Sequence, residues 1–175
     1  MSTPVSSSVA LPLAHVVLRV LVVLNWLYAA AIVLLLVAMP TEQWIMRSFE
    51  LTPSPETDRV IAGLHAVAVI GLVAVPLNHA LLKRLLAMVA TVRAGDPFTA
   101  TNAQRLQVIA WVLLTLQFLG LVIAAIAKAI STPEHPIDLD AGSVVSGWLA
   151  VLLTFLLARV FAHGASMRED LEGTV

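Results

Sequence analysis

Four long apolar runs, separated by polar segments, limit what this chain can fold into. They cover residues 13–39, 60–82, 106–127 and 141–163. A helix needs about 20 apolar residues to cross about 30 Å of hydrocarbon, so each run can span a membrane. Spanning segments must satisfy their own backbone hydrogen bonds, which helices do. The sequence therefore predicts an all-α integral membrane protein, an antiparallel four-helix bundle forming a single domain over residues 1–175.

Composition agrees with a membrane protein and excludes several other classes. The chain is 59% hydrophobic and 12% charged, about half the charged fraction of a soluble domain. It has no cysteine, so it has no disulfide and no thiolate metal site. It lacks the basic stripe that direct nucleic-acid binding requires. The start of the chain has no Lys or Arg before the first run, so we expect that run to be retained as a membrane helix.

The distribution of basic residues predicts an orientation. Lys83, Arg84, Arg93, Arg105, Arg159 and Arg168 fall on one side of the four spans, whereas Arg47, Arg59 and Lys128 fall on the other, among most of the acidic residues. Because loops rich in Lys and Arg stay in the cytoplasm, we place residues 83–105, here called the hinge, in the cytoplasm. Both termini then lie there too. On the opposite side, residues 42–51 are expected to form an interfacial helix with Trp44 turned to lipid.

The hinge carries the most specific local chemistry in the chain. Gly95-Asp96-Pro97 is typical of a turn, since glycine allows positive φ and proline ends the preceding helix. Thr101 and Gln104 have the spacing of a capping box. The pattern predicts a helix that begins near Asn102.

The hinge is also the candidate binding surface. Phe98 follows the turn, Arg93 and Arg105 flank it, and Arg168 can approach it from the tail. An exposed aromatic beside arginines is typical of interface hot spots. The candidate partner-binding residues are Arg93, Asp96, Pro97, Phe98, Asn102, Arg105 and Arg168. The alternative interpretation is a well-formed helix connection without a partner.

Polar residues inside spans are functional candidates because they are costly there. His15, His79 and His163 are expected to converge at the cytoplasmic end of three spans, where three imidazoles can bind a divalent metal. The alternative is hydrogen bonding to headgroups or neighbouring helices, and we predict no cofactor. Arg19 and Arg159 either extend to lipid phosphate or join Arg105 in a positive pocket for a lipid headgroup or an acidic partner segment.

Two absences bear on function. No Asp or Glu lies within the four spans, which argues against proton- or sodium-coupled transport. No catalytic motif is evident, so we predict that the protein is not an enzyme. His65 and His79 are fourteen residues apart on one span, a spacing seen in membrane cytochromes. That arrangement also needs matching histidines on a second span, and these are absent.

Small residues predict how the spans pack. Gly63 and Gly71 suit close helix contact, and Pro76 is expected to kink its helix. In the third run, Gln117, Gly120, Ala124 and Ala127 share a face that we expect to contact a neighbour. In the fourth run, Ser143, Gly147, Ala150, Thr154 and Ala158 form a similar stripe.

The hinge sequence Gly95-Asp96-Pro97-Phe98 with Asn102-Ala103-Gln104-Arg105-Leu106, and the ending from Arg168 to Val175, resemble the four-span DUF2975 family of bacterial inner-membrane proteins. That resemblance implies a membrane partner for a small Xre-like helix-turn-helix regulator, and it supplies no reaction, ligand or catalytic residue. We therefore expect a regulatory or signalling protein that binds membrane lipids and a cytosolic regulator. The first alternative is a small-molecule, lipid or metal-binding membrane carrier, and the second is a haem-binding membrane oxidoreductase. The sequence does not decide whether the protein forms a homo-oligomer.

Overall fold

A computed structural model describes residues 7–38, 55–131 and 141–172. These form four helices, α1 (Ser7–Ala38), α3 (Pro55–Arg93), α4 (Ala100–Ile130) and α5 (Ala141–Glu172). Each helix is long and apolar enough to cross a membrane, so the chain is an all-α, multi-pass membrane protein, as predicted. The interfacial helix expected over residues 42–51 lies outside the described residues.

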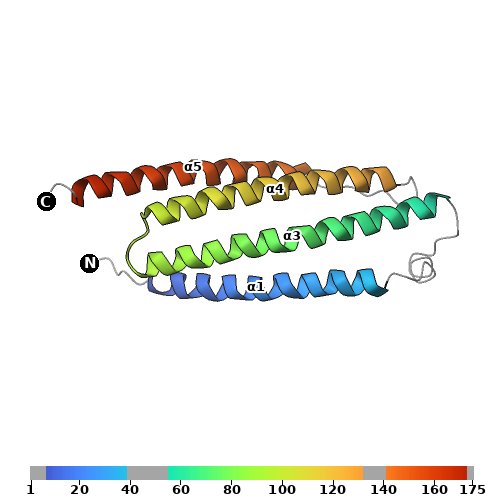
Figure 1. The fold of residues 1–175 in the computed structure, drawn as a ribbon, viewed down its shortest axis with the longest axis horizontal. Coiled ribbons are helices and arrows are strands. Elements are labelled where there is room, and N and C mark those ends of the chain that lie inside the picture. The colour runs from blue at the N-terminus through green and yellow to red at the C-terminus, as the bar shows by residue number, and fades with distance from the viewer. Residues whose placement is uncertain (1–6, 39–54, 132–140, 173–175) are drawn as a thin grey trace.

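The helices pack side by side in an open row (Figure 1). Helix α1 packs on α3, α3 on α4, and α4 on α5. A closed four-helix bundle would also pack the first helix on the last. Among the residues that the structure describes, extensive packing is instead confined to these three consecutive pairs. The predicted all-α arrangement of four long helices packed side by side is thus confirmed, and it takes the form of an open row.

The two outer helices each bury one narrow stripe, which explains the row. On α5 the buried residues Val151, Ala158 and Ala165 are spaced seven apart, as in the seam of a helix pair. The other faces of α1 and α5 are apolar but exposed: Leu34 is 69% and Leu152 is 65% accessible. A helix that is apolar all round is typical of a membrane span, so lipid is the natural cover for these faces.

Glycines allow close approach at some of the expected positions. A Cβ added at Gly63 would lie 2.5 Å from Cγ2 of Ile130, so this glycine lets α3 approach α4. A Cβ at Gly71 would lie 3.2 Å from Cδ1 of Ile32 on α1. The expectation for Gly120 is wrong, because nothing lies within 4 Å of its added Cβ. Gln117 of α4 does contact Gly147 of α5. Gly120, three residues later, is rotated by about 60° around the helix axis and therefore misses α5.

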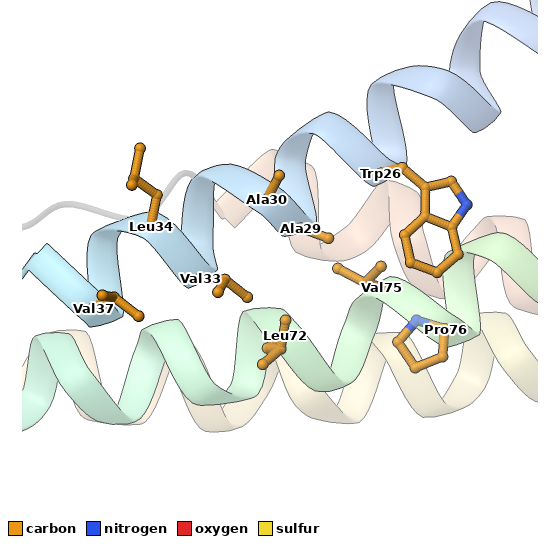
Figure 2. Close-up of a pocket in the computed structure, with 9 residues that line it drawn as sticks. All are labelled: Trp26, Ala29, Ala30, Val33, Leu34, Val37, Leu72, Val75 and Pro76. Atoms are coloured by element: carbon orange, nitrogen blue, oxygen red, sulfur yellow. The ribbon is translucent and has the colours of Figure 1, made fainter.

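Helices α1 and α3 are joined by a polar contact beside Pro76. The buried Asn25 donates from Nδ2 to the Val75 carbonyl at 3.2 Å, and the helix continues through Pro76. The Trp26 ring contacts His79 edge to face, with centroids 5.4 Å apart. Next to this contact the two helices leave an apolar groove of about 630 Å³. In Figure 2, Val33 and Leu72 point toward each other across it.

Candidate docking surface at the hinge

The turn that connects α3 to α4 has the geometry expected from its sequence. Gly95 has a φ of 89°, a conformation that glycine adopts at little cost. The end of α3 is closed by backbone bonds from the amides of Gly95 to the Val92 carbonyl (3.1 Å) and of Asp96 to the Thr91 carbonyl (3.2 Å). The predicted Gly-Asp-Pro turn is confirmed.

Helix α4 begins earlier than predicted. Its N-cap is Thr99, whose hydroxyl accepts the amide of Asn102 at 3.1 Å, and its first residue is Ala100. The prediction of a helix start near Asn102, with Thr101 and Gln104 as a capping box, is therefore wrong. Both threonines precede the apolar run, and Thr99 is the one with the extended backbone that a cap needs (φ −108°, ψ 148°).

Asn102 is fully buried and ties the hinge together. Its Nδ2 donates to Thr91 Oγ1 at 2.7 Å and to the Pro97 carbonyl at 2.9 Å. Its Oδ1 accepts from Nη1 of Arg105 at 2.9 Å. Because none of its surface is accessible, Asn102 cannot touch a partner as the sequence suggested. It supports the surface of the hinge from beneath.

Arg105 is half-buried in the same network. Besides Asn102, its guanidinium reaches the Ala87 carbonyl of α3 at 3.5 Å. Arg105 thus connects α4 to the last turns of α3 and offers only part of its surface to a partner. The contribution of Thr91, which accepts from Asn102 and donates to the Met88 carbonyl at 2.7 Å, was not foreseen. Its only sequence signal is a hydroxyl one turn before the Gly-Asp-Pro turn.

The end of α5 lies against the turn. Arg168 forms an ion pair with Asp96, and both side chains stay partly exposed. The Phe98 ring packs on Phe161, with centroids 5.0 Å apart, and its Cδ1 lies 3.2 Å from the Cβ that Gly164 would carry. The predicted approach of Arg168 to the hinge is confirmed, and Phe161 and Gly164 are additional contacts that sequence reasoning missed.

Enough of this region remains at the surface to contact another protein. Phe98 is 45% exposed despite its contact with Phe161. Arg93, in the last turn of α3, is exposed as well. Together with the Asp96–Arg168 pair, these side chains form what we call the hinge surface. It combines one aromatic ring with cationic and anionic groups held by internal contacts.

The three histidines expected to converge do not form a metal site. His163 is exposed on α5, whereas the Nδ1 atoms of His15 and His79 are buried without a hydrogen-bond partner. Within the described ranges no three His, Cys, Asp or Glu side chains are grouped to hold a metal. The row explains this, because it does not pack α5 on α1. His65 contacts the Ile61 carbonyl of its own helix at 2.9 Å.

The arginine pocket is also divided among the helices. Arg19 is exposed on α1, Arg105 belongs to the hinge network, and Arg159 lines a groove between α4 and α5. The three guanidinium groups therefore do not line one cavity. Of the three, Arg159 alone lines this groove, and its side chain is exposed there.

Comparison with known proteins identifies the family. Residues 46–175 match the family described as a protein of unknown function, DUF2975. The chain belongs to the DUF2975 family. The matched range includes α3, the hinge, α4 and α5, whereas α1 precedes it. No curated protein and no solved structure matches the chain.

Proposed function

We propose that the protein is a non-enzymatic regulatory or signalling protein of the bacterial inner membrane. Its hinge surface faces the cytoplasm and binds a cytosolic helix-turn-helix transcription regulator. The kind of partner comes from the family resemblance described above. The place of binding comes from the residues at the hinge.

The observation that carries this proposal is the internal support of the hinge surface. Asn102 uses both amide hydrogens and its carbonyl oxygen within the hinge. Asp96 and Phe98 are each held by a residue of α5. A surface fixed before binding loses less conformational entropy when a partner docks. The half-exposed Phe98 supplies the aromatic anchor that such interfaces favour.

The position of the hinge in the fold is consistent with this role. The start of α1 and the end of α5 lie at the same end of the molecule as the turn between α3 and α4 (Figure 1). Most of the Lys and Arg residues near the span ends gather at that end, which favours a cytoplasmic location.

Charge reversal at the hinge tests the proposal. We expect Arg93→Glu, measured with the protein in lipid nanodiscs, to weaken binding of a small Xre-like helix-turn-helix regulator by about tenfold, as an unfavourable charge at an interface does. Arg93 is exposed, so the change should leave the fold intact. The measurement is a titration of fluorescently labelled regulator.

Lys128→Glu is the matched control. Lys128 is an exposed cation in the last turn of α4, at the end away from the hinge. We expect this variant to bind like the unmodified protein. Equal loss in both variants, or no binding by the unmodified protein, would contradict docking at the hinge surface.

A further inference from the structure

A second polar feature lies between α4 and α5, in a groove of about 620 Å³. Its floor consists of three buried alanines, Ala103, Ala158 and Ala165. Their side chains are too short to fill the space between the helices. The groove between the two helices is therefore open to the surface above these alanines.

Three side chains with hydrogen-bond donors, Arg159, Gln104 and Gln107, line this groove. Among the residues that the structure describes, Arg159, Gln104 and Gln107 form no side-chain hydrogen bond or ion pair. Helix α4 contains no Asp or Glu, and one turn to either side of Arg159 the residues of α5 are Phe155, Leu156, Ala162 and His163. A cation within a spanning helix is expensive unless an anion or water accompanies it. Arg159 therefore has no acidic residue within one turn on its own helix and is available to an anion from outside the protein.

The groove changes from polar to apolar along its length. Ser166 and Gln104 line the part nearest the hinge, and Arg159 and Gln107 follow. Trp111 and Phe155 line the far part, where their rings meet edge to face with centroids 5.3 Å apart. Phe155 and Ser166 are 11 positions apart, which corresponds to about 16 Å along the helix axis. Trp111 is 56% exposed, so the apolar part is open to the surface.

We propose that this groove binds an anionic phospholipid. Arg159 receives the phosphate, Gln104 and Gln107 donate to the headgroup and glycerol oxygens, and an acyl chain lies on Trp111 and Phe155. Guanidinium and phosphate form charge-assisted hydrogen bonds, which are stronger than neutral ones. Free phosphate has the same charge but would leave the aromatic part uncovered, so the two-part lining favours a lipid. The proposal does not depend on the regulator proposed for the hinge surface.

Arg19 provides a contrast within the same protein. Like Arg159 it is an exposed cation in a spanning helix, but it lies on α1 and does not line this groove. Any bilayer can supply phosphate to such a side chain without a built site. A lipid that is held specifically should therefore depend on Arg159 and be indifferent to Arg19.

The test is native mass spectrometry of the full-length protein in a mild detergent, with phosphatidylglycerol or phosphatidylcholine added. We expect the unmodified protein to retain phosphatidylglycerol preferentially. Arg159→Gln should weaken that retention about fivefold, the effect of one arginine near an anionic lipid surface. Arg19→Gln should leave retention unchanged. Arg159→Lys, which keeps the charge, should restore part of it.

A second variant separates shape from charge. Ala162 is exposed and lines the groove, so Ala162→Phe should fill it and lower phosphatidylglycerol retention while Arg159 remains. Equal retention of the two lipids, or equal losses in Arg159→Gln and Arg19→Gln, would overturn the proposal. Displacement of the lipid by millimolar inorganic phosphate would also overturn it, because free phosphate would then be the ligand.

Discussion

Asn102 shows how one polar side chain can organise a membrane-protein turn. It is inaccessible to solvent, and each of its side-chain hydrogen-bonding groups has a partner. These partners come from the end of α3, from the turn and from α4, so one residue fixes three segments relative to one another. A buried amide that lost these partners would be costly, because each unsatisfied polar group is penalised separately.

The first prediction concerns this residue. Asn102→Ala removes three hydrogen bonds and leaves the Pro97 carbonyl and the Arg105 guanidinium with one partner fewer. We expect the protein to lose about 2–3 kcal/mol of stability, at roughly 1 kcal/mol for each bond. The measurement is the unfolding midpoint in detergent. Lys83→Ala, which changes an exposed side chain of α3 outside the groove, should shift the midpoint little. An unfolding midpoint of Asn102→Ala equal to that of the unmodified protein would show that the Asn102 network contributes no stability.

At the residue scale, the sequence indicates where polar chemistry gathers better than how it is connected. The turn at Gly95 was predictable because positive φ and a following proline have few alternatives. The choice of Thr99 over Thr101 as the cap was not predictable, since both can accept an amide hydrogen. Starting α4 earlier places Asn102 in the buried interior. Asn102, predicted to contact a partner, is instead a buried residue that holds the hinge together.

At the element scale, glycines distinguish the helix faces that touch from those that do not. Gly63 on α3 and Gly120 on α4 both lie in apolar helices. Their surroundings differ: Gly63 is buried against Ile130, whereas Gly120 is exposed with open space around it. The sequence pattern alone could not separate them, because small residues occur on both packed and lipid-facing surfaces.

The paired substitutions Gly63→Ala and Gly120→Ala test this difference. The new methyl group at Gly63 requires Ile130 to move, and such overpacking costs about 1–3 kcal/mol. At Gly120 the methyl group meets nothing, and alanine is the better helix former by about 1 kcal/mol. We therefore expect opposite shifts in thermal stability in detergent. A loss of thermal stability in Gly120→Ala comparable to that in Gly63→Ala would show that Gly120 also faces a neighbouring helix.

At the scale of the whole molecule, the orientation in the membrane is a prediction from charge. Reporter fusions at Pro97 and at Val175 should both report the cytoplasm, and a fusion at Pro55 should report the outside, because basic residues gather at the hinge end. Alkaline phosphatase and green fluorescent protein fusions give complementary signals. A periplasmic signal at Pro97 would reverse the orientation and remove the basis for a cytosolic partner.

The four spanning helices followed from the sequence, but their bounds and their arrangement did not: α3, for example, covers Pro55–Arg93, whereas the apolar run covers residues 60–82. Apolar runs determine which segments can span a bilayer, and all four appear as helices. Four helices close into a bundle only if each outer helix buries two faces, one against each neighbouring helix. In a membrane, residues such as Leu34 and Leu152 are as compatible with lipid as with a neighbouring helix. Hydrophobicity therefore does not distinguish a row from a ring.

The open row has a consequence for how the molecule can move. In a closed ring of helices, separating one pair of neighbours still leaves every helix packed against another. In a row, each interface is the main packing contact between the helices on its two sides. The interface between α3 and α4 divides this molecule into two helix pairs. Asn102 and Arg105 cross that interface at one end, beside the only chain connection between the pairs. A scissor-like motion of the two pairs about the hinge would have its largest amplitude at the opposite end, where Gly63 of α3 packs on Ile130 of α4.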